Sequence, residues 1–251
     1  MKNLVFVIVL LLNFHFLKAQ EVSKSHEIGF GLQYVEIKEG TNYGLVNQGV
    51  NLSVNYHYSR DQELKRFRFS PSINLGANYR QGIGLNWHFN LIDFTYTYMI
   101  CDKDNRNLNI GPYLASNHFY QLYPELQSGH MFWFTSFEIG PKLEWNLYLG
   151  AKHIEIDGLI SIFSLNSRAQ QLREEYFYSL NFWDILTESH SDMSINSINN
   201  YLHIKLSARS KFKSNGKMKL GYSFDFYNYT RSVPFTYLTH SIILSWILGK
   251  K

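Results

Sequence analysis

The sequence predicts an all-β fold, a transmembrane antiparallel β-barrel of ten strands with one long extracellular loop. Apolar and polar residues alternate with a period of two through most of the 251 residues, as expected where the two faces of a strand meet different surroundings. The alternating segments are also longer than the about five or six residues typical of a strand in a soluble domain. Short turns and long loops alternate between them, which is the third observation.

The first twenty residues are predicted to be a signal peptide. Lys2 provides a positive charge ahead of the apolar run from Leu4 to Leu17, and this run is too short to span a membrane comfortably. A membrane anchor is the alternative. We expect residues 1–20 to be removed from an exported protein and residues 21–251 to form the barrel.

Ten segments carry the alternation. In the clearest one, residues 131–149, the odd positions are almost all apolar, whereas polar side chains such as Ser136, Glu138 and Lys142 fall on even positions. An even number of strands places both ends of the barrel on the periplasmic side. The expected strands span residues 27–37, 50–59, 67–80, 84–100, 107–121, 131–149, 153–165, 202–212, 218–227 and 236–248.

Irregularities are expected within four of these strands. The phase of the segment 84–100 slips next to Leu91, and a β-bulge there restores one consistent apolar face. Pro71, Pro112 and Pro141 also lie inside strands, where each removes a hydrogen-bond donor from the ladder. All three fall on the outward phase, so we expect a bulge or a local kink to compensate.

The connections between the strands are of two kinds. One set is short and either charged or rich in glycine, whereas the other includes residues 122–129 and the long segment 166–198. This asymmetry is typical of an outer-membrane barrel, as are aromatic residues such as Trp87 and Trp145 towards the two rims. A soluble barrel or sandwich is the alternative, which strands of this length and a polar face this rich in charge disfavour.

The ending Ala19-Gln20 before Glu21, the chain length and the alternation together resemble small outer-membrane β-barrel proteins of Bacteroidota. A repeated Ile-Gly-Pro-x-Leu motif at residues 110–114 and 139–143 also resembles them. The resemblance covers the whole mature chain, concerns architecture and is not specific to one activity. It implies a place in the cell outer membrane, in contact with its lipid and lipopolysaccharide.

The polar face is expected to line the lumen, with charges of both signs interspersed. Because a ten-stranded barrel is only slightly wider than an eight-stranded one, whose interior side chains fill it, we expect these charges to pair within a plugged lumen. A narrow polar pore or a ligand pocket is the alternative. The predicted polar network comprises Arg68, Arg80, Asp93, Glu138, Lys142, Glu144, Glu155, Asp157, Lys205, Arg209 and Asp225.

Ser116 and His118 are the two catalytic candidates. Outer-membrane lipid hydrolases place a His and a Ser two positions apart on a lipid-facing strand, with a third polar group that orients the His. Ser116-Asn117-His118 has this spacing in the reverse order, and its expected neighbours include no acid. Omptin proteases also have ten strands, but the paired acidic motif that they use at the extracellular rim finds no match. We therefore expect no enzyme activity.

The segment 166–198 contains the one helix that the mature sequence suggests. Tyr176, Leu180 and Trp183 fall near one stripe at helical spacing. An aromatic surface of this kind is expected to be covered. We expect the segment to pack over the barrel mouth as a lid, and docking on an outer-membrane protein partner is the alternative.

The composition excludes several classes of function. Cys101 is the only cysteine, so a disulfide scaffold is excluded, and no Cys/His spacing indicates a metal site or another cofactor. A net charge of +4 without a basic run gives no support for nucleic-acid binding. We expect a non-enzymatic barrel with a structural or accessory role in an outer-membrane assembly. A narrow transport pore and a lipid-modifying hydrolase are the alternatives.

Overall fold

The computed structural model describes residues 23–40, 44–79, 83–103, 105–123, 130–150, 152–168, 183–184, 187, 189–211, 217–231 and 233–250. The predicted signal peptide lies outside this part of the chain. Among the described residues, no helix is long and apolar enough to cross a bilayer.

The described chain forms thirteen strands in one antiparallel sheet. Three pairs of consecutive strands, β3 and β4, β8 and β9, and β10 and β11, each continue one another along the wall, so the wall has ten strands as predicted. The strands are β1 (Ser23–Glu39), β2 (Val46–Asp61), β3 (Lys65–Phe69), β4 (Ser72–Asn78), β5 (Gly84–Lys103), β6 (Arg106–Tyr123), β7 (His130–Leu149), β8 (Lys152–Ile160), β9 (Phe163–Arg168), β10 (Ser194–Ser197), β11 (Tyr201–Lys211), β12 (Met218–Tyr229) and β13 (Phe235–Lys250).

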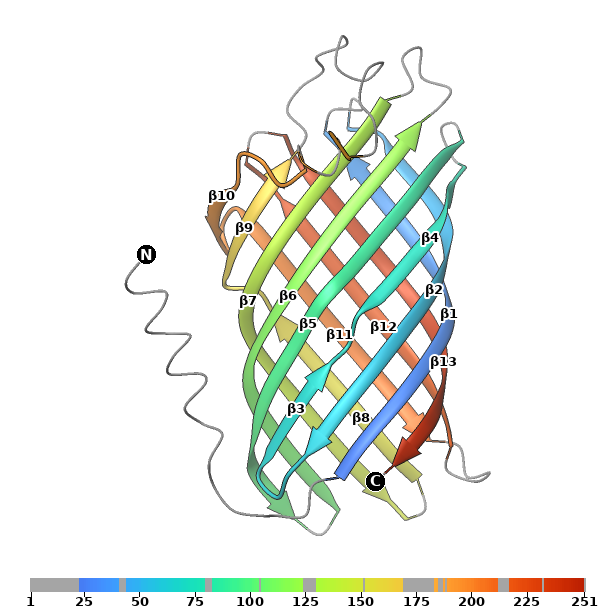
Figure 1. The fold of residues 1–251 in the computed structure, drawn as a ribbon, viewed down its shortest axis with the longest axis vertical. Coiled ribbons are helices and arrows are strands. Elements are labelled where there is room, and N and C mark those ends of the chain that lie inside the picture. Colours follow the sequence, from blue (N-terminus) through green and yellow to red (C-terminus); the bar gives the residue numbers. More distant parts are fainter. Residues whose placement is uncertain are drawn as a thin grey trace.

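The sheet closes into a barrel because its first and last strands pair. The β1–β13 ladder runs from the pair Ser25 and Lys250 to the pair Glu39 and Phe235. Figure 1 shows the tilted strands around the wall, with the start of β1 and the end of β13 at the lower end. We call this end the termini end. The opposite end, where β6 ends and β7 begins, is called the loop end.

The outer wall is apolar, and most of the inner wall is polar. On β1, for example, Phe30 and Leu32 are 53% and 58% exposed, whereas Gln33 between two outward residues is buried. The same holds on β2, where the exposed Leu52 alternates with buried Asn51 and Ser53. An apolar surface that continues around the whole wall is unsuited to water and matches the hydrocarbon layer of a membrane. The fold is therefore a transmembrane β-barrel.

The structure confirms the predicted bulge in β5. The register between β5 and β6 shifts between Asn90 and Ile92. Asn90 and Asp93 are three positions apart and would face opposite sides of a regular strand, but with the bulge both face inward. Pro71 occupies the break between β3 and β4, and the register with β2 is the same on both sides of this break. Pro112 and Pro141 lie directly opposite each other in the β6–β7 ladder, and both are exposed on the outer wall.

The long loop is shorter at both ends than predicted. Residues 166–168 complete β9, and residues 194–197 form β10, which pairs with β9 through Ser194 opposite Asn166. The sequence hid residues 166–168 and β10, because serine and asparagine occupy both faces there and the alternation of apolar and polar residues is lost. Residues 169–182 between them lie outside the described part, and with them the contact residues Tyr176 and Leu180.

Candidate functional site

An aromatic cluster fills the lumen towards the loop end. The rings pack closely, with 4.7 Å between the centroids of Phe119 and Tyr237 and 5.0 Å between those of Phe134 and Phe235. The members of the cluster come from the six strands β1, β6, β7, β11, β12 and β13, so the cluster closes the lumen from several sides. We call it the aromatic plug; its members are Val35, Ile37, Phe119, Phe134, Tyr201, Tyr227, Tyr229, Phe235 and Tyr237.

Arg168 caps the aromatic plug at the loop end. Its guanidinium pairs with the buried carboxylate of Glu39 and lies 5.0 Å from the ring centroid of Phe235. It also donates hydrogen bonds to the backbone carbonyls of Val233 (3.1 Å) and Trp133 (3.4 Å). One side chain thus holds three of the segments that meet at this end of the barrel.

Below the plug, His203 lies between two carboxylates. Its Nδ1 is 2.5 Å from Glu138 Oε1, and its Nε2 is 3.5 Å from Asp225 Oδ1. Glu138 also accepts hydrogen bonds from the Tyr201 hydroxyl (2.6 Å) and from Asn117 Nδ2 (3.1 Å). These contacts tie the lower face of the plug to the polar layer beneath it.

A cavity of about 130 Å³ occupies the middle of the barrel. Drug-sized ligands need pockets of about 300 Å³ or more, so this space suits water or a small solute. Lys205 lines it and remains 32% exposed although it points into the lumen. Its amine is 3.6 Å from Asp225, and Asp93 lines the same cavity from β5.

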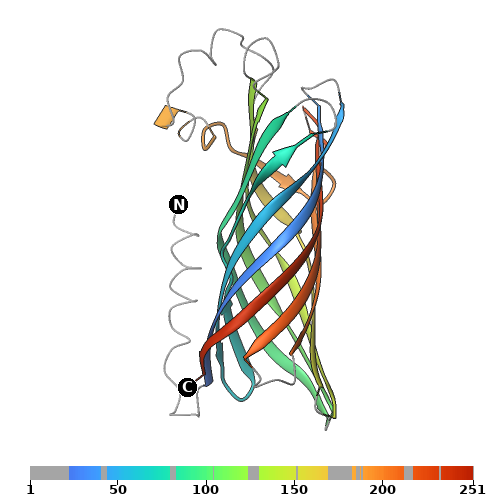
Figure 2. The same cartoon turned by 90° about the vertical axis from the view of Figure 1, so that its right-hand side faces the viewer.

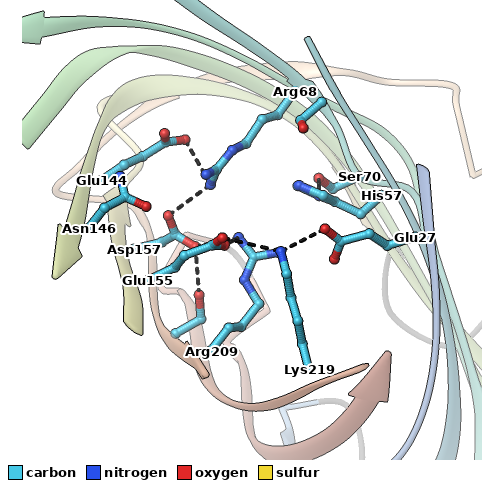
Figure 3. Close-up of polar contacts among 12 residues, drawn as sticks. Glu27, His57, Arg68, Ser70, Glu144, Asn146, Glu155, Asp157, Arg209 and Lys219 are labelled. Atoms are coloured by element: carbon cyan, nitrogen blue, oxygen red, sulfur yellow. Dashed lines mark hydrogen bonds and ion pairs between the residues drawn. The ribbon is translucent and has the colours of Figure 1, made fainter. Parts of the chain in front are cut away.

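A network of ion pairs crosses the lumen towards the termini end (Figure 3). Arg68 on β3 reaches Glu144 (3.1 Å) and Asp157 (3.0 Å), which lie on β7 and β8. Arg209 on β11 pairs with Asp157 (3.0 Å) and Glu155 (3.2 Å). A charge in the interior is costly unless it is paired, and each of these five groups has at least one partner of opposite sign.

The network is completed by two groups that are not part of the predicted polar network. Lys219 on β12 bridges Glu27 on β1 (2.6 Å) and Glu155 on β8 (3.2 Å). Figure 3 shows these groups arranged as a ring, with His57 and Ser70 on its far side from Glu155. His57 Nδ1 is 2.6 Å from Ser70 Oγ. We call the ring of Glu27, Arg68, Glu144, Glu155, Asp157, Arg209 and Lys219 the ion-pair ring.

The predicted network residues that the structure describes all face the lumen; apart from Asp93, which lines the cavity, they fall in two groups. Lys142 joins the ion-pair ring, 3.6 Å from Glu144, whereas Glu138 and Asp225 lie higher, around His203. Arg80 lies outside the described residues. Glu27 and Lys219 were detectable in principle, because each falls on the inward phase of a predicted strand. Glu39 and Arg168 lay just beyond the predicted strand ends, where no alternation indicated their direction.

Ser116 and His118 make separate contacts in the structure. The Ser116 hydroxyl accepts a hydrogen bond from the backbone N–H of Ile92 (3.2 Å) and so caps the β-bulge. His118 Nδ1 has no hydrogen-bond partner among the described residues. The imidazole instead packs edge-on against Phe137, with 5.8 Å between the ring centroids. Both contacts lie within the barrel wall, between neighbouring strands.

The end of the long loop lies against the outer wall. The His190 and His118 rings are 5.0 Å apart, and the Ser189 and Tyr120 hydroxyls are 3.0 Å apart. His118 and Tyr120 alternate with inward residues of β6, so their partners sit outside the barrel, where Figure 2 also shows the described pieces of this segment. This part of the loop therefore does not cover the barrel mouth as predicted. Trp183 is 70% exposed.

No protein-family model and no curated protein match the sequence. Solved structures of similar shape include the outer membrane protease OmpT from Escherichia coli, with 6% identity, a TM-score of 0.46 and coverage of 93% of this chain and 99% of that chain. The translocator domain of the autotransporter NalP from Neisseria meningitidis has 4% identity, a TM-score of 0.43 and coverage of 98% and 94%. Ail, the attachment invasion locus protein of Yersinia pestis, has 9% identity, a TM-score of 0.34 and coverage of 90% and 99%. Likenesses at this level carry no argument about activity or partners.

Proposed function

We propose that this protein is a closed, non-enzymatic barrel of the cell outer membrane with a structural or accessory role. The aromatic plug is the observation that carries the proposal. Phe119, Phe134 and Phe235 are each at most 1% exposed, so the plug leaves no water-filled path past them. A pore would instead need a continuous polar path from one end to the other.

The ion-pair ring supports the same proposal from the termini end. Arg68 and Arg209 both contact Asp157 from opposite sides, and Lys219 joins Glu27 to Glu155. Opening a path through the ring breaks contacts between buried ions, which is strongly unfavourable. The barrel therefore has one barrier at each end of its central cavity, and its rigid wall is suited to hold the loop end in place for an assembly.

A planar-bilayer recording tests the closed state. We expect the native protein to give no steady current. A Phe119→Ala/Phe235→Ala/Arg68→Ala variant should conduct, because it removes two rings from the plug and one cation from the ion-pair ring. The matched control is Phe30→Ala on the outer wall, which we expect to remain silent. A steady current from the native protein would overturn the proposal.

The accessory role needs a separate measurement. The wall would contact outer-membrane lipid and lipopolysaccharide, and the outer face near Trp183 is available to a partner protein because that ring is largely exposed. Mild solubilisation of native membranes, followed by affinity purification of the tagged chain, is expected to recover a second outer-membrane protein in constant ratio. Recovery of the chain alone after chemical cross-linking would contradict the accessory role.

A narrow pore is the second candidate, favoured by the cavity. Charged groups such as Lys205 and Asp225 face this space, as they would along a permeation path. The recording described above separates the two candidates.

A further inference from the structure

Asp93 is a buried carboxylate that has no close partner of opposite charge in the described part of the chain. The β-bulge directs its side chain inward, where it is 7% exposed and lines the central cavity. Among the described residues, none donates a hydrogen bond to this carboxylate or approaches it within 4 Å as an ion-pair partner. A buried carboxylate without such a partner is unfavourable, so the contents of the cavity have to provide one.

The charge balance around the cavity favours a cation. Lys205 attracts Asp93 across the space, but its amine is in contact with Asp225 instead. Among the described carboxylates that line the cavity, Asp93 is therefore the one without an ion-pair partner. The other acids that line the cavity are each paired, Glu27 with Lys219 at 2.6 Å, Asp157 with Arg209 at 3.0 Å and Asp225 with Lys205 at 3.6 Å.

The shape of the cavity favours an organic cation over a metal ion. Its volume of about 130 Å³ is close to the roughly 150 Å³ of a protein cavity that accepts a molecule as large as benzene. No group of three His, Cys, Asp or Glu residues within the described chain is placed to hold a metal ion.

We propose that the central cavity binds a small organic ammonium ion, with the Asp93 carboxylate as its principal partner. The ammonium N–H groups would donate to this carboxylate while the remainder of the molecule lies in the space below Tyr227. This site is separate from the closed-barrel proposal, because binding requires only a transient opening of one of the two barriers, which gives no steady current through the barrel.

Titration calorimetry of the full mature chain in detergent, with ethanolamine hydrochloride as the probe, tests the site. We expect saturable binding to the native protein and at least about tenfold weaker binding to Asp93→Asn, because a charge-assisted hydrogen bond is lost. The control is Asp102→Asn, an exposed carboxylate on the same strand, with unchanged affinity. Absence of binding to the native protein, or equal binding to Asp93→Asn, overturns the proposal.

A second variant keeps the test decisive if Asp93→Asn does not fold. Lys205→Met removes the cation that competes for Asp93, so ethanolamine should bind more tightly to it than to the native protein. Unchanged or weaker binding would contradict a site for cations. A titration with sodium chloride at equal ionic strength identifies binding that is only a response to salt, which would also overturn the proposal. The bilayer recording tests the closed barrel and the calorimetry tests the cavity, so one proposal can fail without the other.

Discussion

Arg168 and Glu39 form a buried ion pair between the last residue of β9 and the last residue of β1. The guanidinium carbon also lies 6.0 Å from the Phe134 ring centroid and 5.0 Å from that of Phe235. This one contact joins the two sides of the loop end above the aromatic plug. The strand that precedes the long loop is thereby fixed to the first hairpin of the barrel.

Removal of the Arg168 side chain should destabilise the barrel. Arg168→Ala leaves the Glu39 carboxylate buried without its guanidinium, a change that costs about 3 kcal/mol or more of unfolding free energy in comparable pairs. Urea unfolding of the protein in lipid vesicles measures this loss. The double variant Arg168→Met/Glu39→Gln removes both charges and should recover most of it. A double variant as unstable as Arg168→Ala would show that packing, not charge, is responsible.

Deletion of Leu91 should prevent correct assembly. The β-bulge at this position allows both halves of β5 to present their apolar side chains to lipid. Without the extra residue, one half must turn Phe94 and its outward neighbours into the lumen, because a shift of one residue reverses the faces of a strand. The difference in gel mobility between unheated and heated samples measures how much of the protein is folded. The control Leu91→Ala, at a side chain that is 53% exposed, should fold normally.

The loss of stability caused by a charge on the outer wall should depend on how deep in the membrane the charge lies. Leu52→Arg places a cation in the apolar band and should cost about 2–4 kcal/mol near the bilayer midplane. Leu64→Arg is the matched control, because Leu64 is 56% exposed in the turn between β2 and β3 at the termini end. We expect little effect there. Equal effects of the two substitutions on unfolding in vesicles would contradict the proposed position of the membrane.

The sequence alone was sufficient for the wall of the barrel. The side-chain period of a strand is two, so each residue's face follows from parity, and this correctly places Phe30 outside and Arg68 inside. The phase slip at Leu91 was visible for the same reason. Parity failed at β10, where Ser194 and Asn196 flank a single apolar residue and resemble a loop.

The contacts inside the lumen were decided by the tertiary structure. Arg68 and Asp157 are 89 positions apart, and Arg168 and Glu39 are 129 apart. Parity states that such residues face inward, but their heights along the axis depend on the register of every ladder between them and on the tilt of the closed wall. The separation of the aromatic plug from the ion-pair ring therefore follows only from the closed barrel. The same holds for the position of Asp93 at the cavity between them.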